Sequence, residues 1–261
     1  MEPCLTRIAL LLTAIFLCSH SLADSATQVR PTLVVGFTEF PPAIYSDAQG
    51  VAHGPLAEAT RELLHKAGYQ ASFRSLPTAR LYAALKNGSI TLWAGAGGKP
   101  GLAAHTLETR HPLAEIRLQI YHRPETPAPR LPEGLAGQGV IMVGGYDYWE
   151  RINRVLENPQ YSIRLHHTAS HLSGLRMLEQ RRADFLLGYR IPTEHARRQL
   201  GIEPLPSITL ERVPIRFIVS RYAPDAEALR DALDRAHEQL MVATPGWPKG
   251  DTEARLPAAS R

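Results

Sequence analysis

The segment from Gly36 to Pro42 combines residue types that bind or transform small molecules. An apolar run, Leu33–Val35, precedes it, and an amphipathic stretch from Leu56 to Ala67 follows. This pattern predicts a buried strand, a rigid loop and a helix, and open α/β sheets bind their ligands at the carboxyl ends of such strands. Within the loop, Glu39 has a carboxyl group that can transfer a proton, and Phe40 has a ring that can stack on a ligand.

Other chemically suggestive patterns are weaker. His166, His167 and His171 have a spacing that places them neither on one helix face nor on adjacent strands, so ordinary solvated histidines are favoured over a zinc site. The stretch Gly95–Gly98 lacks the Lys-Ser/Thr of a phosphate-binding loop and the G-x-G-x-x-G of a dinucleotide site. A turn that lets a ligand approach the backbone explains these glycines more simply. No Gly-x-Ser-x-Gly nucleophile elbow occurs. We expect no metal and no cofactor.

Residues 1–23 have the pattern of a secretory signal peptide. Arg7 precedes an apolar run from Ile8 to Leu17, and Ser21-Leu22-Ala23 supplies small residues for cleavage. A run of about ten apolar residues is shorter than the roughly twenty that span a bilayer. We expect export to the periplasm with the mature chain starting at Asp24. A lipoprotein signal at Cys18 is a weaker alternative, because a leucine stands where a small residue is required.

Composition limits the classes of function. Both cysteines, Cys4 and Cys18, fall in the leader, so the mature chain is expected to have no disulfide. The 261 residues are 44% hydrophobic, enough for a large core in one or two lobes. The net charge of +4 is modest, and the arginines are interspersed with acids rather than gathered in a basic stripe. We expect a soluble monomer with no nucleic-acid partner.

Hydrophobic periodicity predicts two successive βαβαβ units. The first has strands at 33–35, 70–75 and 89–94 with helices at 56–67 and 77–86; the second has strands at 139–143, 161–165 and 184–187 with helices at 146–156 and 170–181. Such alternation indicates parallel strands joined by right-handed crossovers. The predicted fold class is therefore α/β with two lobes.

A strand at 213–220 and a helix at 224–241 come too late in the chain to belong to a finished second lobe. We expect the chain to cross back, near 121–124 and again near 210–214, and to complete the first lobe through a two-strand hinge. The expected boundaries are 24–122 for the first part of lobe 1, 123–211 for lobe 2, 212–246 for the completion of lobe 1, and 247–261 for a C-terminal tail.

Four segments resemble the family 3, or amino-acid-type, periplasmic solute-binding proteins of ABC transporters. They are 36–42 with Gly50 and Gly54, 81–88, 135–146 and 177–184. The resemblance covers nearly the whole mature chain in the right order. It implies a type II periplasmic-binding-protein fold, in which the ligand lies between the lobes. The loop after the first strand, the turn before the second lobe's first helix and the end of that lobe's third strand would contact it.

The chain departs from this family where an amino acid would be held. The arginine of the family's Thr-x-x-Arg motif, which binds a carboxylate with two hydrogen bonds, corresponds to Leu102, and Arg110 is out of register. The aspartate that binds the ammonium group corresponds to Tyr189. A zwitterion without these partners loses two charge-assisted hydrogen bonds, a cost of several kcal/mol. Ordinary α-amino acids are therefore not the expected ligands.

The side chains expected in the cleft are instead mainly aromatic and basic. The predicted ligand-binding residues are Glu39, Phe40, Tyr45, Arg80, Trp93, Gly95, Tyr146 and Tyr189, with Tyr148, Trp149 and Arg190 as further candidates. Aromatic walls stack on rings or cations, and Arg80 is a candidate anchor for an anion. Ordinary packing or a surface position is the competing interpretation for each.

The resemblance implies a protein that captures a small polar or aromatic solute between two closing lobes. Its partner would be an ABC-type transporter permease or a membrane sensor receptor. We expect no catalysis. Two alternatives stay open: a periplasmic enzyme like cyclohexadienyl dehydratase on the same fold, with Glu39 as general acid, and an interaction module that binds no ligand.

Overall fold

The computed structural model describes residues 30–146 and 148–244, so the predicted signal peptide and C-terminal tail lie outside the described residues. One sheet contains β1 (Thr32–Phe37), β4 (Gln70–Ser75), β5 (Leu92–Ala96), β6 (Thr106–Glu108), β7 (Ala114–His122), β8 (Gly139–Val143), β9 (Arg164–Thr168), β10 (Phe185–Tyr189) and β11 (Ser207–Ser220). The short strands β2 (Tyr45–Ser46) and β3 (Ala52–His53) form a separate ribbon.

The α-helices are α2 (Pro55–Lys66), α3 (Thr78–Lys86), α4 (Glu150–Leu156), α5 (His171–Glu179), α6 (Arg190–Leu200) and α7 (Ala226–Ala243). Two short 3-10 helices, η1 (Glu133–Leu135) and η2 (Pro159–Tyr161), lie in connections. None of the described helices is long and apolar enough to cross a membrane.

The strands follow the order β4-β1-β5-β11-β7-β10-β8-β9, with β6 added against β11. Strand β1 is parallel to β4 and β5, and β8 is parallel to β9 and β10. The predicted α/β class and the parallel arrangement within each unit are confirmed. We refer below to the part built around β4, β1 and β5 as lobe 1 and to the part built around β10, β8 and β9 as lobe 2.

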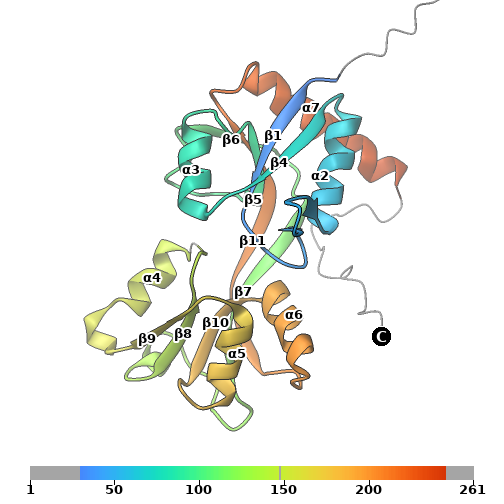
Figure 1. Ribbon diagram of the computed structural model, residues 1–261. Coiled ribbons are helices and arrows are strands. Elements are labelled where there is room, and N and C mark those ends of the chain that lie inside the picture. Colours follow the sequence, from blue (N-terminus) through green and yellow to red (C-terminus); the bar gives the residue numbers. More distant parts are fainter. Residues whose placement is uncertain (1–29, 147, 245–261) are drawn as a thin grey trace, which may run out of the picture. The chain divides into compact units, whose positions relative to one another are not determined.

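Strands β7 and β11 connect these two parts (Figure 1). The segment Ile215–Val219 of β11 pairs with β5, whereas the segment Ser207–Ile215 pairs with β7. The end of β7, Leu118–His122, then pairs with β10. Two long antiparallel strands thus run from one lobe to the other, and the boundaries at 122 and 211 stay predictions.

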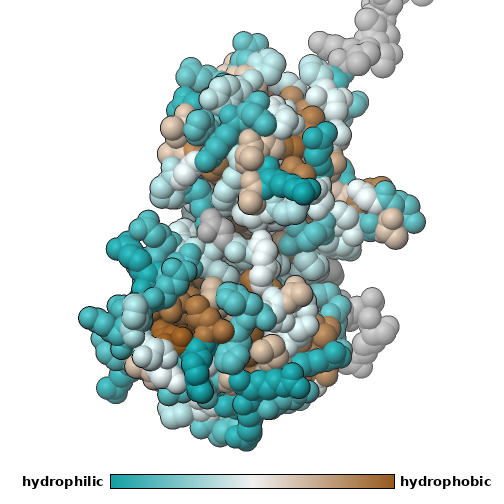
Figure 2. All heavy atoms as spheres, turned by 60° about the vertical axis from the view of Figure 1, so that its left-hand side comes forward, coloured by the Kyte–Doolittle hydropathy of each residue, from teal (hydrophilic) through white to brown (hydrophobic). Residues whose placement is uncertain are grey.

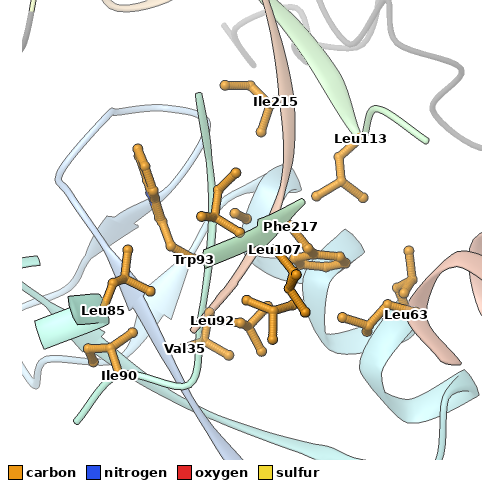
Figure 3. Packing of buried hydrophobic residues seen from close by; sticks show 14 of the residues in the cluster. Val35, Leu63, Leu85, Ile90, Leu92, Trp93, Leu107, Leu113, Ile215 and Phe217 are labelled. Atoms are coloured by element: carbon orange, nitrogen blue, oxygen red, sulfur yellow. The ribbon is translucent and has the colours of Figure 1, made fainter. Parts of the chain in front are cut away.

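The core of lobe 1 joins segments that are far apart in the sequence. Figure 3 shows Val35 of β1, Leu92 of β5 and Phe217 of β11 together with Leu63 of α2. Leucine side chains of α7, including Leu233, belong to the same cluster. The last described helix therefore packs with the first unit of the chain, because only there does its apolar face find a partner.

The sheet of lobe 2 is covered on both faces. In β8, Val140 and Met142 belong to one hydrophobic cluster, whereas Ile141 and Val143 belong to another. Successive side chains of a strand point to opposite faces, so a run of apolar residues is what a strand buried on both sides requires.

Several predicted elements were misplaced. Helix α6 was not predicted from the sequence; its Pro192 lies in the first turn, where proline is tolerated. Helix α4 begins at Glu150 rather than at Tyr146, which belongs to no helix. Strand β9 runs from Arg164 to Thr168 rather than over 161–165, because the 3-10 helix at Pro159–Tyr161 takes up the preceding residues.

Candidate ligand-binding site

Three aromatic rings from both lobes meet at the carboxyl ends of their strands. Phe40, in the loop after β1, lies with its ring centroid 5.8 Å from that of Tyr146 and 5.5 Å from that of Tyr189. Tyr146 follows β8, Tyr189 ends β10, and their centroids are 5.6 Å apart. All three pairs meet edge to face, a geometry that the ring quadrupoles favour.

Two further aromatic residues, Tyr148 and Trp149, pack against the ring of Tyr189. The ring of Tyr148 stacks on it at 6.1 Å, and the Trp149 ring meets it edge to face at 6.4 Å. The Tyr148 hydroxyl donates to the carbonyl of Val143 at 3.0 Å, which ties Tyr148 to the end of β8. Burial raises the pKa of Tyr146 to about 12 and also raises the pKa of Tyr148, so both phenols are neutral at physiological pH.

These rings border a first cavity of about 90 Å³. Its lining is mostly apolar and comes from Phe37, Thr38, Phe40, Ala43, Ile44, Pro55, Leu56, Thr78, Tyr82, Trp93, Ala94, Gly95, Ala96, Lys99, Ala114, Ile116, Tyr146, Tyr189, Ile191 and Ile215. Lys99 is only 8% exposed. Its Nζ lies 3.7 Å from the centroid of the Trp149 ring, close enough for a cation–π interaction.

The position of Trp93 in this cavity depends on Gly95. A Cβ atom at residue 95 would lie 1.8 Å from the Trp93 ring, far inside contact distance. The sequence pattern suggested that this glycine lets a ligand approach the backbone. In the structure, the indole of Trp93 occupies that space.

A second cavity of about 500 Å³ lies beside the first and is more polar. Glu39, Ser75, Ser170, His171, His195 and Gln199 are among its lining residues. The Glu39 carboxylate accepts hydrogen bonds from the Ser46 backbone N–H at 3.0 Å, the Ser46 hydroxyl at 2.8 Å and the Ser75 hydroxyl at 2.5 Å. Glu39 therefore ties the loop after β1 to the β2 ribbon and to the end of β4.

Two hydrogen bonds connect the lobes at this point. The Thr78 hydroxyl, at the start of α3, donates to the carbonyl of Gly145 at 2.7 Å. The Tyr146 hydroxyl donates to the carbonyl of Glu39 at 3.4 Å. Thr38, Thr78 and Tyr146 line both cavities, so they form the wall between them.

His171 supports this wall from lobe 2. It begins α5, behind Ser170, whose hydroxyl caps the helix by accepting from the Ser173 N–H at 3.1 Å. Its ring lies 5.2 Å from that of Tyr146, and its Nε2 atom is buried without a hydrogen-bond partner in the described structure. Burial lowers the pKa of His171 to about 4, so the imidazole is neutral at physiological pH.

Lobe 2 also holds a third cavity of about 140 Å³ beneath α4, lined almost entirely by apolar residues. Figure 2 shows hydrophilic residues over most of the visible face; the largest hydrophobic area lies in its lower half, and smaller ones lie in the upper half and at the lower right. This third cavity contains no residue of the aromatic cluster formed by Phe40, Tyr146 and Tyr189.

The predicted site residues are distributed unevenly. Phe40, Trp93, Gly95, Tyr146 and Tyr189 line the first cavity, and Glu39 and Tyr146 line the second. Tyr45 and Arg80 line none of the three cavities. Tyr45 lies beside His53 in the β2–β3 ribbon, and Arg80 is exposed on α3. The ligand-binding roles of all eight stay predictions.

The structure locates Leu102 and Tyr189, which the resemblance aligns with the family's amino-acid clamp, and also Arg110. Leu102 is buried in the core of lobe 1, and Arg110 pairs with the buried Asp234 of α7, with its Nε 3.2 Å from Oδ2. Neither side chain lines the first cavity, whereas Tyr189 does.

Sequence reasoning missed Lys99, Tyr82, Ile116 and Ile215. Lys99 directly follows the glycines after β5, a position that was a usable signal. Ile116 and Ile215 come from the connecting strands β7 and β11, and only the antiparallel pairing of these strands brings them to the cavity.

No family model and no curated protein matches this chain. Solved structures do match it. A histidine kinase sensor domain with similarity to periplasmic binding proteins is 22% identical, with a TM-score of 0.65 over 82% of this chain and 91% of that one. A structure from work on glutathione import through the cystine ABC importer of Streptococcus mutans is 16% identical, with a TM-score of 0.67 over 82% of this chain and 90% of that one.

This chain has the periplasmic-binding-protein fold. An ancestral amino acid-binding protein, a precursor of cyclohexadienyl dehydratase, shares the fold at 14% identity, with a TM-score of 0.61 over 81% of this chain and 90% of that one. The suspected family and the predicted fold agree with these neighbours. At sequence identities this low, the similarity to these proteins shows a shared fold and nothing more.

Proposed function

We propose that this protein is an exported solute-binding protein whose two lobes close on a small polar or aromatic solute. The observation that carries the proposal is the first cavity, whose lining combines Phe40 and Trp93 of lobe 1 with Tyr146 and Tyr189 of lobe 2. A site divided between two lobes forms only when they approach, so a solute that fills it favours the closed state.

The connecting strands provide the means of closing. Ile116 of β7 and Ile215 of β11 line the cavity, and the same strands continue into both lobes. A bend of these two strands moves Phe40 relative to Tyr146 and Tyr189 without disturbing either core. The hydrogen bond from Thr78 to Gly145 then holds the lobes together at the edge of the site.

The partner of the closed protein is an ABC-type transporter or a membrane sensor. Both roles occur among proteins of the same fold, since one neighbour is a histidine kinase sensor domain and another comes from an ABC import system. Export of the mature chain rests on the signal-peptide pattern of residues 1–23.

A role in catalysis is not part of the proposal. A dehydratase-like mechanism would assign proton donation to Glu39, but its carboxylate already accepts three hydrogen bonds that position loops. Turnover of prephenate or arogenate by the purified protein, abolished by Glu39→Gln, would contradict this view.

Thermal-shift screening of the mature protein tests the proposal. The panel would hold amino acids, polyamines, aromatic acids and sugars. A ligand at 100 times its Kd stabilises a protein by about 2.7 kcal/mol, which raises the unfolding temperature measurably. A solute that stabilises the protein should also reduce its radius of gyration in small-angle X-ray scattering. No stabilisation by any member of the panel would argue against solute binding.

A further inference from the structure

We infer that lobe 2 has a binding site of its own, the third cavity beneath α4, and that this site takes a small uncharged molecule with one apolar ring. The inference goes beyond the proposed function, because this cavity shares no described lining residue with the first or the second cavity. Three observations lead to it: the lining of the cavity, its volume, and the contacts at its mouth.

Six aliphatic side chains form the floor of the third cavity. They are Ile120, Leu135, Val140, Ile152, Leu156 and Leu187. Each is at most 7% exposed, and all six belong to one hydrophobic cluster of lobe 2. Aliphatic groups make many dispersion contacts with an apolar ligand, but they do not compensate a charged group for the water that it leaves. The floor therefore favours an apolar, uncharged ligand.

The cavity has room for one ring. Its volume of about 140 Å³ is far above the roughly 10–15 Å³ that one water needs, and it is close to the roughly 150 Å³ of an engineered apolar cavity that binds benzene. Water in an apolar space finds few hydrogen-bond partners, so an apolar molecule displaces it at little cost. Drug-sized ligands occupy pockets of roughly 300–1,000 Å³, so the volume limits the ligand to a single ring.

An irregularity in β11 shapes one edge of the cavity. The register of β11 against β7 shifts between Thr209 and Glu211, so Leu210 is an extra residue at this point. A bulge of this kind bends its strand and redirects a side chain. Leu210 lines the cavity, as does Ile120 of β7. The cavity therefore lies where the strand pairing is irregular, and regular packing does not fill it.

Arg151 of α4 crosses the mouth of the cavity toward this bulge. Its Nη2 donates to the Leu210 carbonyl at 3.2 Å and also to the Glu211 carboxylate. Because Arg151 lines the cavity as well, its methylene groups cover apolar surface while its guanidinium is bound outside. An anionic ligand would have to compete with Glu211 for this cation, which again favours an uncharged one.

The mouth is accessible from solvent. Leu131, which lines the cavity, is 39% exposed, and Val155 of α4 is half-buried. A small molecule can therefore reach the floor past these side chains without separation of the two lobes.

Nuclear magnetic resonance titration of the mature protein tests the inference. The probes are benzene and toluene, and benzoate and benzylamine carry the same ring with a negative or a positive charge. We expect benzene or toluene to bind with a Kd at least tenfold lower than either charged compound, because a charge entering the cavity loses its water. Nuclear Overhauser effects should connect toluene with methyl groups of Leu135, Val140 and Leu156.

A cavity-filling variant and a matched control locate the site. Val155→Phe places a larger side chain in the cavity and should weaken toluene binding at least tenfold. Val242→Phe makes the same change at an 88% exposed position of α7 and should leave the Kd unchanged. Circular dichroism and unfolding temperatures establish that each variant is folded, and Leu131→Phe replaces Val155→Phe if the latter does not fold.

Several results would overturn the inference. One is a toluene Kd that is the same for the cavity-filling variant and the unmodified protein. Another is toluene in contact with Phe40 and Trp93 of the first cavity instead of the methyl groups of the third. Charged compounds that bind the third cavity as tightly as toluene, or no binding of benzene and toluene up to their solubility, would do the same. None of these results bears on solute binding between the lobes, which the thermal-shift panel tests separately.

Discussion

The first and second cavities share Thr38, Thr78 and Tyr146 as a common wall, yet their chemistry differs. The first is small and mostly apolar, and Lys99 is the charged side chain among its described lining residues. The second is larger and lined by hydroxyl, imidazole, amide and carboxylate groups, several of which are already bonded to one another. Polar side chains of the second cavity hold loops in place, whereas the walls of the first cavity are mainly apolar and aromatic.

This contrast follows from solvation. A charge facing water gains little from a partner, whereas a charge shielded from water gains much from one. Recognition is therefore expected in the first cavity and support of the lobe contact in the second. Four experiments test that division, from the largest expected effect to the smallest.

Of the four experiments, protonation of His171, which lines the second cavity, should have the largest effect on stability. Its pKa of about 4 lies below the roughly 6.5 of an unfolded histidine, so the unfolded chain binds more protons between these pH values. Stability from this residue is complete above pH 6.5 and is lost as pH falls toward 4, by about 3 kcal/mol. Urea unfolding of the protein and of His171→Gln at several pH values should show a weaker pH dependence in the variant.

The control is His65→Gln, on an exposed position of α2. Acidic groups with lowered pKa values, such as Asp47 and Glu115, add their own pH dependence, but equally in all variants. Equal slopes for His171→Gln and the unmodified protein would show that the buried imidazole does not support the wall.

A methyl group added to a glycine should affect stability and ligand affinity unequally in the two cavities. Gly95→Ala places a Cβ against the Trp93 ring in the first cavity, and such overpacking costs roughly 1–3 kcal/mol. Displacement of the indole should also reduce ligand affinity at least tenfold. Gly144→Ala, in the second cavity, meets its nearest neighbour at 3.5 Å and should be tolerated. Calorimetry and chemical unfolding measure both, and equal effects on affinity would refute the division.

Removal of the Phe40 ring should open the lobes. Phe40→Ala loses edge-to-face contacts with Tyr146 and Tyr189, each worth about 0.5–1.5 kcal/mol. We expect a roughly tenfold loss of affinity and a larger radius of gyration without ligand. Tyr45→Ala removes a more exposed aromatic ring that lines none of the three cavities, and it should change neither quantity. A comparable loss of affinity in both variants would mean that the aromatic cluster of Phe40, Tyr146 and Tyr189 has no special role in binding.

The smallest effect on ligand binding is expected from a change in Thr78, in the wall between the two cavities. Thr78→Ala removes the hydrogen bond to the Gly145 carbonyl, which contributes about 0.5–1.5 kcal/mol to the closed state. The ligand should dissociate a few times faster in stopped-flow measurements. Thr78→Ser keeps the hydroxyl and should behave like the unmodified protein. If the ligand dissociates from the serine variant as fast as from the alanine variant, then the methyl group of Thr78, and not its hydrogen bond, slows dissociation.

The fold could be predicted well because it depends on local patterns. Apolar runs such as Val140–Val143 identify strands buried on both faces, and the glycine and proline signals between them set most connections. Prediction failed where local signals conflict with packing. Helix α6, which has Pro192 in its first turn, was not predicted. The predicted helix at 146–156 begins only at Glu150, because Tyr146, Tyr148 and Trp149 pack in a hydrophobic cluster that the local pattern does not describe.

The candidate site was predicted only in part, for a related reason. Phe40 lies in the loop after a strand, where the rule for open α/β sheets places ligands, and Tyr146 and Tyr189 lie where the family resemblance implied ligand contacts. Arg80 follows a strand as well, but the helical phase of α3 turns it to solvent. The sequence by itself determined the two α/β units and carries the pattern of an export signal, because both depend on residue type and order. Only the tertiary structure decided that Lys99 lines the cavity beside Trp149 and that Ile116 and Ile215 complete it, because the pairing of β7 with β11 brings together residues almost 100 positions apart.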